Sequence, residues 1–455
     1  MIVMKFGGTS VESREALERL TGIVARHRAE RPIVVVSAMG KTTNKLLETA
    51  QEAAAGRRER ALELVDELRM YHLKEGLPVA GAAAADLDRH IRAHFDWLEE
   101  LVKGLSIVGE LSARSTDAIA SIGERLSSLV TTFAIRNAGM RAEHVDSRQI
   151  VVTDDRFTQA QPNLEETYRR CEERLTRAAA SAVVVMGGFI GATSNGQTTT
   201  LGRGGSDYSA AIVGAGVGAK EIQIWTDVDG MLTSDPRIVA DGHRIKSISF
   251  AEAAELAYFG AKVLHPATVL PAVERDIPVL ILNSRRPEQE GTRVTSQATP
   301  SANAVKSISS KRGVTVINIH STRMLMAHGF LRQIFEIFDR YRISVDMIST
   351  SEVSVSVTLD RVEPIEEICE ELRQFAEVRV EDGLSIVCLV GENIRHTPGI
   401  AGRVFERIRG TNIHMISQGA SKLNLGFVVA DEDLAGVVRA LHEEFFSTLD
   451  PAVFD

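Results

Sequence analysis

Residues 198–211 read TTTLGRGGSDYSAA, a glycine-rich turn followed by an apolar, helix-forming segment. The glycines at 202, 204 and 205 carry no side chain, so backbone N–H groups there can approach an anion closely. Arg203 adds a planar guanidinium that suits a phosphate or a carboxylate. A helix starting at Ser206 would turn its positive N-terminal end to the same anion. The stretch therefore predicts an anion site, although a plain glycine turn with Ser206 as helix cap gives the same local pattern.

A second anion-binding turn is predicted near the start of the chain. Residues 2–6 form a short apolar strand, KFGGTS follows at 5–10, and residues 11–27 have the pattern of an amphipathic helix. Lys5 would point its ammonium at a transferring phosphate, and Asp207, in the first turn after the glycine loop, would orient a lysine or a metal ion. Alone, a lysine before a glycine pair is also typical of a solvated strand end.

Other predicted strands end in similar turns. Strands at 33–37, 182–186 and 221–225 lead into residues 38–44, 187–191 and 226–230. Parallel strands of an α/β sheet place ligands outside their carboxyl ends, so these turns are expected to share one edge. The GKT triplet at 40–42 resembles part of a P-loop, but Val35 stands where the first glycine of that motif must fall, so we reject a P-loop.

Length and composition indicate the class of protein and exclude some partners. The chain has 455 residues and a net charge of −9 with interspersed signs, which predicts several domains and disfavours nucleic acid as the main partner. Cys171, Cys369 and Cys388 lack metal-site spacing and indicate reduced thiols in a cytosolic protein. No stretch reaches the length of a membrane span. We expect a cytoplasmic protein without a membrane or nucleic-acid partner.

Two helical regions separate the first strands from the later ones. Residues 43–104 predict a helical insertion, and residues 111–137 a longer helix with an apolar stripe. Glu124 lies off that stripe, so spacing alone predicts an ordinary surface acid.

The C-terminal third contains a repeat. Residues 314–360 and 385–431 each predict a strand, a helix that starts at a glycine, and two strands, and another helix follows each. This order describes two ferredoxin-like βαββαβ modules, at about 311–383 and 384–455. The second lacks a closing strand, so we expect the spare strand at 304–310 to complete it. Residues 296–303, rich in Ser, Ala and Thr, are the predicted linker.

Six motifs together resemble aspartate kinase of the amino-acid kinase superfamily, with a tail similar to tandem ACT domains. They are KFGGTS (5–10), GERLS (123–127), TLGRGGSD (200–207), WTDV (225–228), DPR (235–237) and FGAKVLHP (259–266). The resemblance implies a three-layer α/β kinase domain with a mostly parallel sheet at 1–295 and a regulatory ACT tail at 304–455.

The resemblance implies transfer of the γ-phosphoryl group of MgATP to the side-chain carboxylate of L-aspartate, the first step of lysine, threonine and methionine biosynthesis. By similarity Lys5 stabilises the transferred group and Asp207 organises lysine and metal, with the Mg²⁺ carried by ATP rather than by assigned protein ligands. Leu232 stands where relatives often have an aromatic residue, which puts adenine stacking there in doubt. The implied substrate contacts are Thr43, Glu124, Arg203, Gly204, Gly205 and Ser206, and the implied nucleotide contacts are Lys5, Gly7, Gly8, Ser10, Thr226, Asp227, Arg237 and Lys262.

The tail resembles that of the lysine-inhibited class, which implies L-lysine, ahead of L-threonine, as effector. Asp346 or Glu352 could pair the effector's ammonium, and backbone groups at Gly329 could bind its carboxylate. ACT-like modules commonly pair edge to edge, which implies a homodimer or larger assembly. Three alternatives remain: a plain dimerisation module, another amino-acid kinase, and a catalytically silent amino-acid sensor. The implied effector contacts are Met324, His328, Gly329, Phe330, Leu331, Val345, Asp346, Ser351 and Glu352.

Overall fold

The structure is a computed structural model that describes residues 1–259, 266–297, 299–324, 328–360 and 364–455. The chain forms two compact units, Met1–Met231 with Val263–Gln297, and Leu232–Lys262 with Ala298–Asp455. The contacts of residues 232–259 thus assign them to the same unit as the C-terminal residues, whereas the sequence places them in the first domain.

The first unit is built on a mainly parallel sheet. Residues of β1 and β2 are buried throughout, as expected when helices cover both faces of a parallel sheet. Helix α6 packs on one set of strands and α9 on another, and both helices are buried around most of their surface. The strand order is β3 (Ala142–His144), β5 (Val183–Gly187), β2 (Pro32–Val36), β1 (Ile2–Phe6), β8 (Ile222–Thr226) and β10 (Val279–Asn283), all parallel, followed by antiparallel β11 (Thr292–Thr295).

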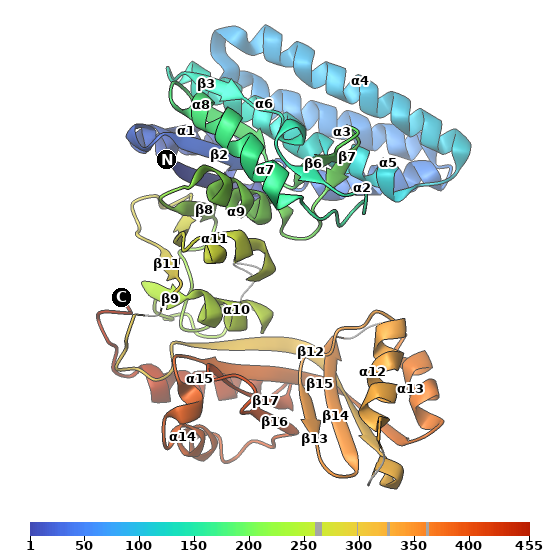
Figure 1. The fold of residues 1–455 in the computed structure, drawn as a ribbon, viewed down its shortest axis with the longest axis vertical. Helices are drawn as coiled ribbons and strands as arrows, with labels where there is room; N and C mark the ends of the chain where they lie inside the picture. Colours follow the sequence, from blue (N-terminus) through green and yellow to red (C-terminus); the bar gives the residue numbers. More distant parts are fainter. Residues whose placement is uncertain (260–265, 298, 325–327, 361–363) are drawn as a thin grey trace. The chain divides into compact units, whose positions relative to one another are not determined.

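The helices of this unit include the expected insertion. In it the long helices α3 and α4 lie side by side (Figure 1). The predicted single helix at 111–137 is divided at Ser121 into two helices, although Ser121 keeps helical backbone angles and its hydroxyl donates to the Ala118 carbonyl. The helices are α1 (Arg14–Arg26), α2 (Thr42–Ala54), α3 (Arg58–Gly76), α4 (Ala84–Val108), α5 (Ala113–Ala120), α6 (Ile122–Asn137), α9 (Gly205–Val217) and α11 (Leu270–Glu274).

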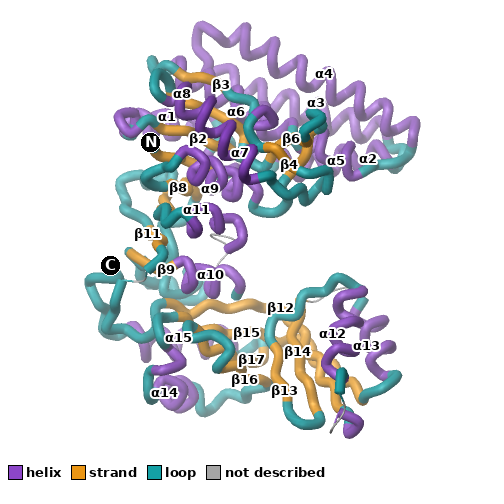
Figure 2. The backbone as a smooth tube through the Cα atoms, in the orientation of Figure 1, coloured by secondary structure: helices purple, strands orange, loops and turns teal. Residues whose placement is uncertain are grey.

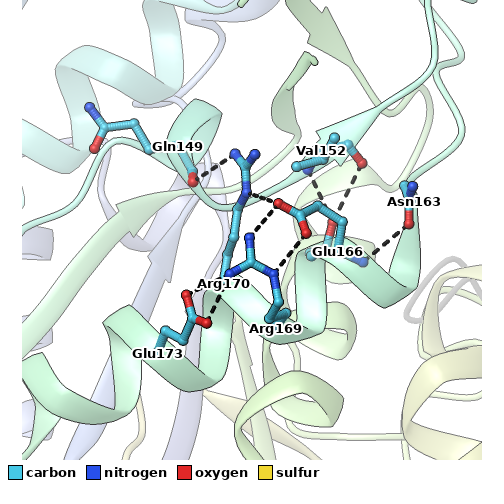
Figure 3. A network of polar contacts seen from close by, with 8 residues as sticks. Gln149, Val152, Asn163, Glu166, Arg169, Arg170 and Glu173 are labelled. Atoms are coloured by element: carbon cyan, nitrogen blue, oxygen red, sulfur yellow. Dashed lines mark hydrogen bonds and ion pairs between the residues drawn. The ribbon is translucent and has the colours of Figure 1, made fainter.

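A short helix and a small sheet support the glycine loop. Helix α7 (Leu164–Arg170) begins where the Asn163 side chain accepts the Glu166 N–H, and Glu166 pairs with Arg169 and Arg170 one turn later (Figure 3). It continues through a wider turn into α8 (Thr176–Ala179). The small sheet consists of β4 (Val152–Thr153), β6 (Ile190–Thr193) and β7 (Thr198–Thr200), and β7 runs directly into the loop.

The second unit contains an antiparallel sheet with the expected repeat. Its two longest strands, β12 and β15, pair along most of their length (Figure 2). Residues 307–312 of β12 lie beside 385–390, and 314–320 beside 377–384, with a register shift near Gly313, whose φ is +67°. The strand order is β13 (Ile348–Thr350), β14 (Ser354–Asp360), β12 (Ser307–His320), β15 (Glu377–Val390), β17 (Asn424–Ala430) and β16 (Met415–Gln418).

Helices complete each half of that sheet. Helices α12 (Phe330–Arg340) and α13 (Ile365–Arg373) lie next to each other, as do α14 (Ile400–Arg407) and α15 (Leu434–Phe446). The same unit holds β9 (Ser247–Ser249) and α10 (Phe250–Tyr258), which opens with a capping box between Ser249 and Glu252. The predicted fold class, a mostly parallel α/β domain followed by ferredoxin-like modules, is confirmed.

No helix in the described ranges combines the length and apolarity that crossing a membrane requires.

Candidate active site

The turns after β1 and β2 meet closely at the carboxyl edge of the parallel sheet. The Gly40 N–H donates to the Gly8 carbonyl at 3.0 Å. A Cβ at Gly8 would lie 2.9 Å from the Gly40 oxygen and 3.1 Å from that of Ala38, so only glycine allows this approach. The strand ends therefore converge as the sequence predicts.

The glycine loop and α9 bring an acid to the end of β1. Gly204 has a left-handed φ of +71° and caps α9, which begins at Gly205, one residue before the predicted start. Asp207, in the first turn of α9, pairs with Lys5, with 2.7 Å between Oδ1 and Nζ. Both side chains are largely buried, so solvent screens this pair only weakly.

A cavity of about 390 Å³ opens among these elements. It collects the two residues predicted to be catalytic and all of those predicted to bind the amino-acid substrate. The predicted residues that line it are Lys5, Gly8, Thr43, Glu124, Arg203, Gly204, Gly205, Ser206 and Asp207.

The sequence reading missed several lining residues. Ser37 and Lys41 belong to the turn after β2 and Asn44 to the first turn of α2, and none of the three was assigned a role from the sequence. Lys41 lies in the GKT triplet, and because a P-loop is rejected there, the sequence assigns no role to its charge. Phe189 follows the Gly187-Gly188 pair, and its ring would collide at 2.7 Å with a Cβ at Gly205.

Glu124 is not the surface acid that its spacing predicts. Helix α6 is covered nearly all round, and Glu124 is 3 % exposed. Burial raises its pKa to about 8, although the Ala38 N–H and the charge of Lys5 act in the opposite direction. Within the described part of the chain, its Oε2 has no hydrogen-bond partner. A buried carboxylate with a free oxygen in a cavity is suited to a cationic group of a ligand.

Of the residues predicted to bind the nucleotide, Lys5 and Gly8 line the cavity itself. Gly7, Ser10 and Thr226 lie at the ends of β1 and β8 beside the cavity, where the Gly7 N–H donates to the Trp225 carbonyl at 3.0 Å. Thr226 donates its hydroxyl to Asp227 at 3.2 Å.

Arg237 belongs to the second unit, where it pairs with Asp235 and is 86 % exposed. Lys262 lies outside the described residues.

The predicted effector residues belong to the first half of the C-terminal sheet. Met324, Phe330 and Val345 share one apolar core, and Gly329 caps α12 with a φ of +84°. Asp346 is paired with Lys311, 2.7 Å away, and the acid side chain is 7 % exposed.

Four further predicted effector residues are polar or surface residues of the same half. His328, Leu331 and Glu352 are exposed, and the Ser351 hydroxyl accepts the Ser354 N–H.

Comparison with known proteins places this arrangement in a family. The amino acid kinase family matches residues 1–283, and an ACT domain matches residues 387–445. Aspartokinase 2 of Arabidopsis thaliana is 40% identical over 99% of this chain and 85% of its own length. Lysine-sensitive aspartokinase 3 of Escherichia coli is 37% identical over 98% of this chain and 99% of its own.

Solved structures agree with the sequence relatives. E. coli aspartokinase III in complex with aspartate and ADP has a TM-score of 0.85 at 37% identity, covering 98% of this chain and 100% of that one. The same enzyme in complex with lysine and aspartate also gives 0.85, covering 98% and 99%. This chain belongs to the aspartokinases of the amino acid kinase family.

Proposed function

We propose that this protein transfers the γ-phosphoryl group of ATP to the side-chain carboxylate of L-aspartate, giving 4-phospho-L-aspartate and ADP. The observation that carries the proposal is that one cavity holds two features together. They are the buried Glu124, whose Oε2 has no hydrogen-bond partner among the described residues, and the Lys5–Asp207 ion pair. The relative solved with aspartate and ADP supports the same substrates.

Recognition of aspartate requires one anionic and one cationic contact. Glu124 receives the α-ammonium group, because its side chain is buried and its Oε2 has no hydrogen-bond partner among the described residues. Arg203 binds a carboxylate through its fork of N–H donors. Thr43 and Ser206 add hydroxyls, and the backbone at Gly204 and Gly205 adds N–H groups at the start of α9.

Phosphoryl transfer between two anions depends on positioning and on charge neutralisation. Lys5 supplies the positive charge for the transferred group, and Asp207 holds its ammonium in place. Lys41, on the wall formed by the turn after β2, can add a second positive charge.

A magnesium ion fits this site as part of the nucleotide. Mg²⁺ prefers oxygen ligands, and the cavity offers the Asp207 carboxylate at its edge. Among the described residues no group of three or more His, Cys, Asp or Glu side chains could hold a metal. The nucleotide phosphates would therefore supply most of the ligands, and the ion would neutralise charge between them.

We propose L-lysine as a feedback inhibitor that binds the first ACT module. An E. coli relative is lysine-sensitive, and its structure has been solved with lysine. In this chain the Lys311 ammonium lies 2.7 Å from Asp346, so at that acid the effector's ammonium would take the place of Lys311. The strands β13 and β16 are the sheet edges and expose Ile348 and Ile416, which supports a homodimer through this sheet.

The test is ADP release in the presence of MgATP, with L-aspartate or L-glutamate, and with or without L-lysine or L-threonine. We expect turnover that depends on aspartate and is suppressed by lysine. Suppression by threonine alone would reassign the effector. A folded protein that binds lysine but releases no aspartate-dependent ADP would be a sensor rather than a kinase.

A further inference from the structure

A second cavity, of about 250 Å³, lies at the carboxyl ends of β3 and β5. His144 ends β3 and Gly187 ends β5, so this cavity shares the sheet edge that carries the active site. None of the residues predicted for aspartate, nucleotide or effector lines it. Its polar lining is His90, His94, Arg125, Ser128, His144, Asp146 and Ser147.

Arg125 has no direct ion-pair partner among the described residues, although the charge of Asp146 in the same lining acts on it. Asp146 is the acid in the lining, and it is engaged with Arg148, 2.6 Å away. In the described part of the chain the Arg125 guanidinium makes no ion pair or hydrogen bond. Burial and the nearby Arg148 lower the pKa of Arg125 to about 10, although its charge persists at neutral pH. An unpaired, partly buried guanidinium is unfavourable unless a ligand supplies the anion.

The rings of His94 and His144 are fixed by hydrogen bonds and are mostly unprotonated at neutral pH. The His94 Nδ1 donates to the His90 carbonyl at 2.8 Å, which leaves its Nε2 for other contacts. The His144 Nε2 lies 3.0 Å from the Ser128 hydroxyl. Burial lowers the pKa of both rings, that of His94 to about 4, and Arg125 contributes to both shifts. A bound anion would reverse this effect, so binding should take up protons.

We propose that this cavity binds a small, doubly charged oxyanion, either a phosphate group or a dicarboxylate, with Arg125 as its principal ligand. The guanidinium fork suits both kinds of oxyanion, and the volume admits a molecule larger than the bare ion. Adjacent residues of α6 then serve different ligands, Glu124 in the active-site cavity and Arg125 here.

The pH dependence of binding follows from the charged groups around the cavity. Protonation of the imidazoles at low pH adds positive charge to that of Arg125, and the Asp146–Arg148 pair contributes little net charge. The groups that face the cavity or act on it are His90 and His94 from α4, Arg125 and Arg136 from α6, His144 from β3, and Asp146 and Arg148 from the turn that follows β3.

The test is calorimetric titration of the full chain with inorganic phosphate and, separately, with succinate, at about pH 6 and about pH 8. The variants are Arg125→Gln and, as the matched control, Arg203→Gln in the active-site cavity. We expect one of the anions to bind, more tightly and with proton uptake at the lower pH. Arg125→Gln should weaken binding about tenfold or more, while Arg203→Gln should retain it.

The two anions distinguish the sources, because preferential binding of phosphate indicates a phosphorylated ligand and preferential binding of succinate a dicarboxylate. Histidine ring NMR on the unaltered chain covers the case in which Arg125→Gln does not fold. The pKa values of His94 and His144 should rise when the anion is added, and the ring signals of His27, outside the cavity, should not change. Absence of binding by either anion up to about 10 mM, or binding that only Arg203→Gln abolishes, would overturn the proposal.

Discussion

Glu124 is a single residue on which the proposed recognition of aspartate depends. Its carboxylate is buried and its Oε2 lacks a partner within the described ranges. We expect Glu124→Gln to lower kcat/KM for aspartate about 100-fold, because the substrate ammonium loses a charged partner in a dry site. Steady-state kinetics measure this loss, and the KM for ATP should stay nearly constant. The melting temperature should not fall, because Glu124 is protonated below about pH 8 in the ligand-free protein and glutamine replaces it with a neutral side chain of similar shape.

The same residue sets a pH dependence. Because the pKa of Glu124 is raised from 4.5 to about 8, the ionised form that pairs with ammonium becomes common only above that pH. We expect kcat/KM for aspartate to increase as the pH rises through about 8, and Glu124→Gln to lose this step. A profile for the unaltered protein that is flat between about pH 7 and 9 would contradict the assignment.

The stability of the ligand-free protein depends on pH in the opposite direction to kcat/KM. The folded state holds the Glu124 proton more tightly than the unfolded state, so the free energy of unfolding should fall as the pH rises from 4.5 to about 8. Denaturant titrations of the ligand-free protein, compared with Glu124→Gln, isolate this contribution. Saturating aspartate should oppose the fall.

The sequence predicts the position of a residue where that position depends on local order, and does not where it depends on distant segments. The glycine loop, Lys5 and Asp207 are recognisable because each follows a strand or opens a helix. Glu124 is not, because its burial requires that α6 be covered beyond its apolar stripe, and buried Ser127 and Thr131 show that it is. That covering comes from segments distant in the sequence.

At the scale of elements, Asp117 joins α5 to the strand that leads into the glycine loop. Its Oδ2 accepts the N–H groups of Thr158 and Thr200 at 2.8 and 2.9 Å, and its Oδ1 accepts the Thr200 hydroxyl at 2.6 Å. The side chain is 1 % exposed. We therefore regard Asp117 as a positioning residue for the loop that carries Arg203.

Asp117→Asn should destabilise the protein by about 2 kcal/mol, because an amide replaces one of these acceptor oxygens with a donor. The KM for aspartate should rise more than kcat falls, since the loop is displaced but the Lys5–Asp207 pair is kept. Chemical denaturation and steady-state kinetics give the two readouts. The exposed Asp155→Asn is the control and should change stability by no more than about 0.5 kcal/mol.

Elements with strong local signals were predicted, and those that depend on distant contacts were not. The repeat in the C-terminal third predicted two modules because each carries its own strands and glycine-started helix. The division at Ser121 between α5 and α6 was missed, because Ser121 keeps helical backbone angles and no proline stands there.

For the molecule as a whole, the second unit is assembled from separated parts of the chain. Residues 232–259 contact the C-terminal residues through α10, where Glu255 accepts hydrogen bonds from Ser421 and Asn424 at 2.7 and 2.6 Å. Lys306, just before β12, pairs with Glu252, and neither side chain is exposed to solvent. The sequence of 232–259 gives no sign of this association, because it arises only from these contacts.

This buried pair gives a test of the discontinuous unit. Lys306→Met should destabilise the second unit by about 3 to 5 kcal/mol, because Glu252 would keep a buried charge without its partner. Hydrogen exchange followed by mass spectrometry should show lost protection in α10 and in the first half of β12, and unchanged protection in α6. The double variant Lys306→Met with Glu252→Gln should recover much of the loss, since the remaining groups are neutral and the capping of α10 is preserved. Arg332→Met, which breaks an exposed pair with Glu336, is the control and should cost less than about 0.5 kcal/mol. If Lys306→Met exposed α6 as much as α10, the pair would stabilise the chain generally rather than join residues 232–259 to the C-terminal sheet.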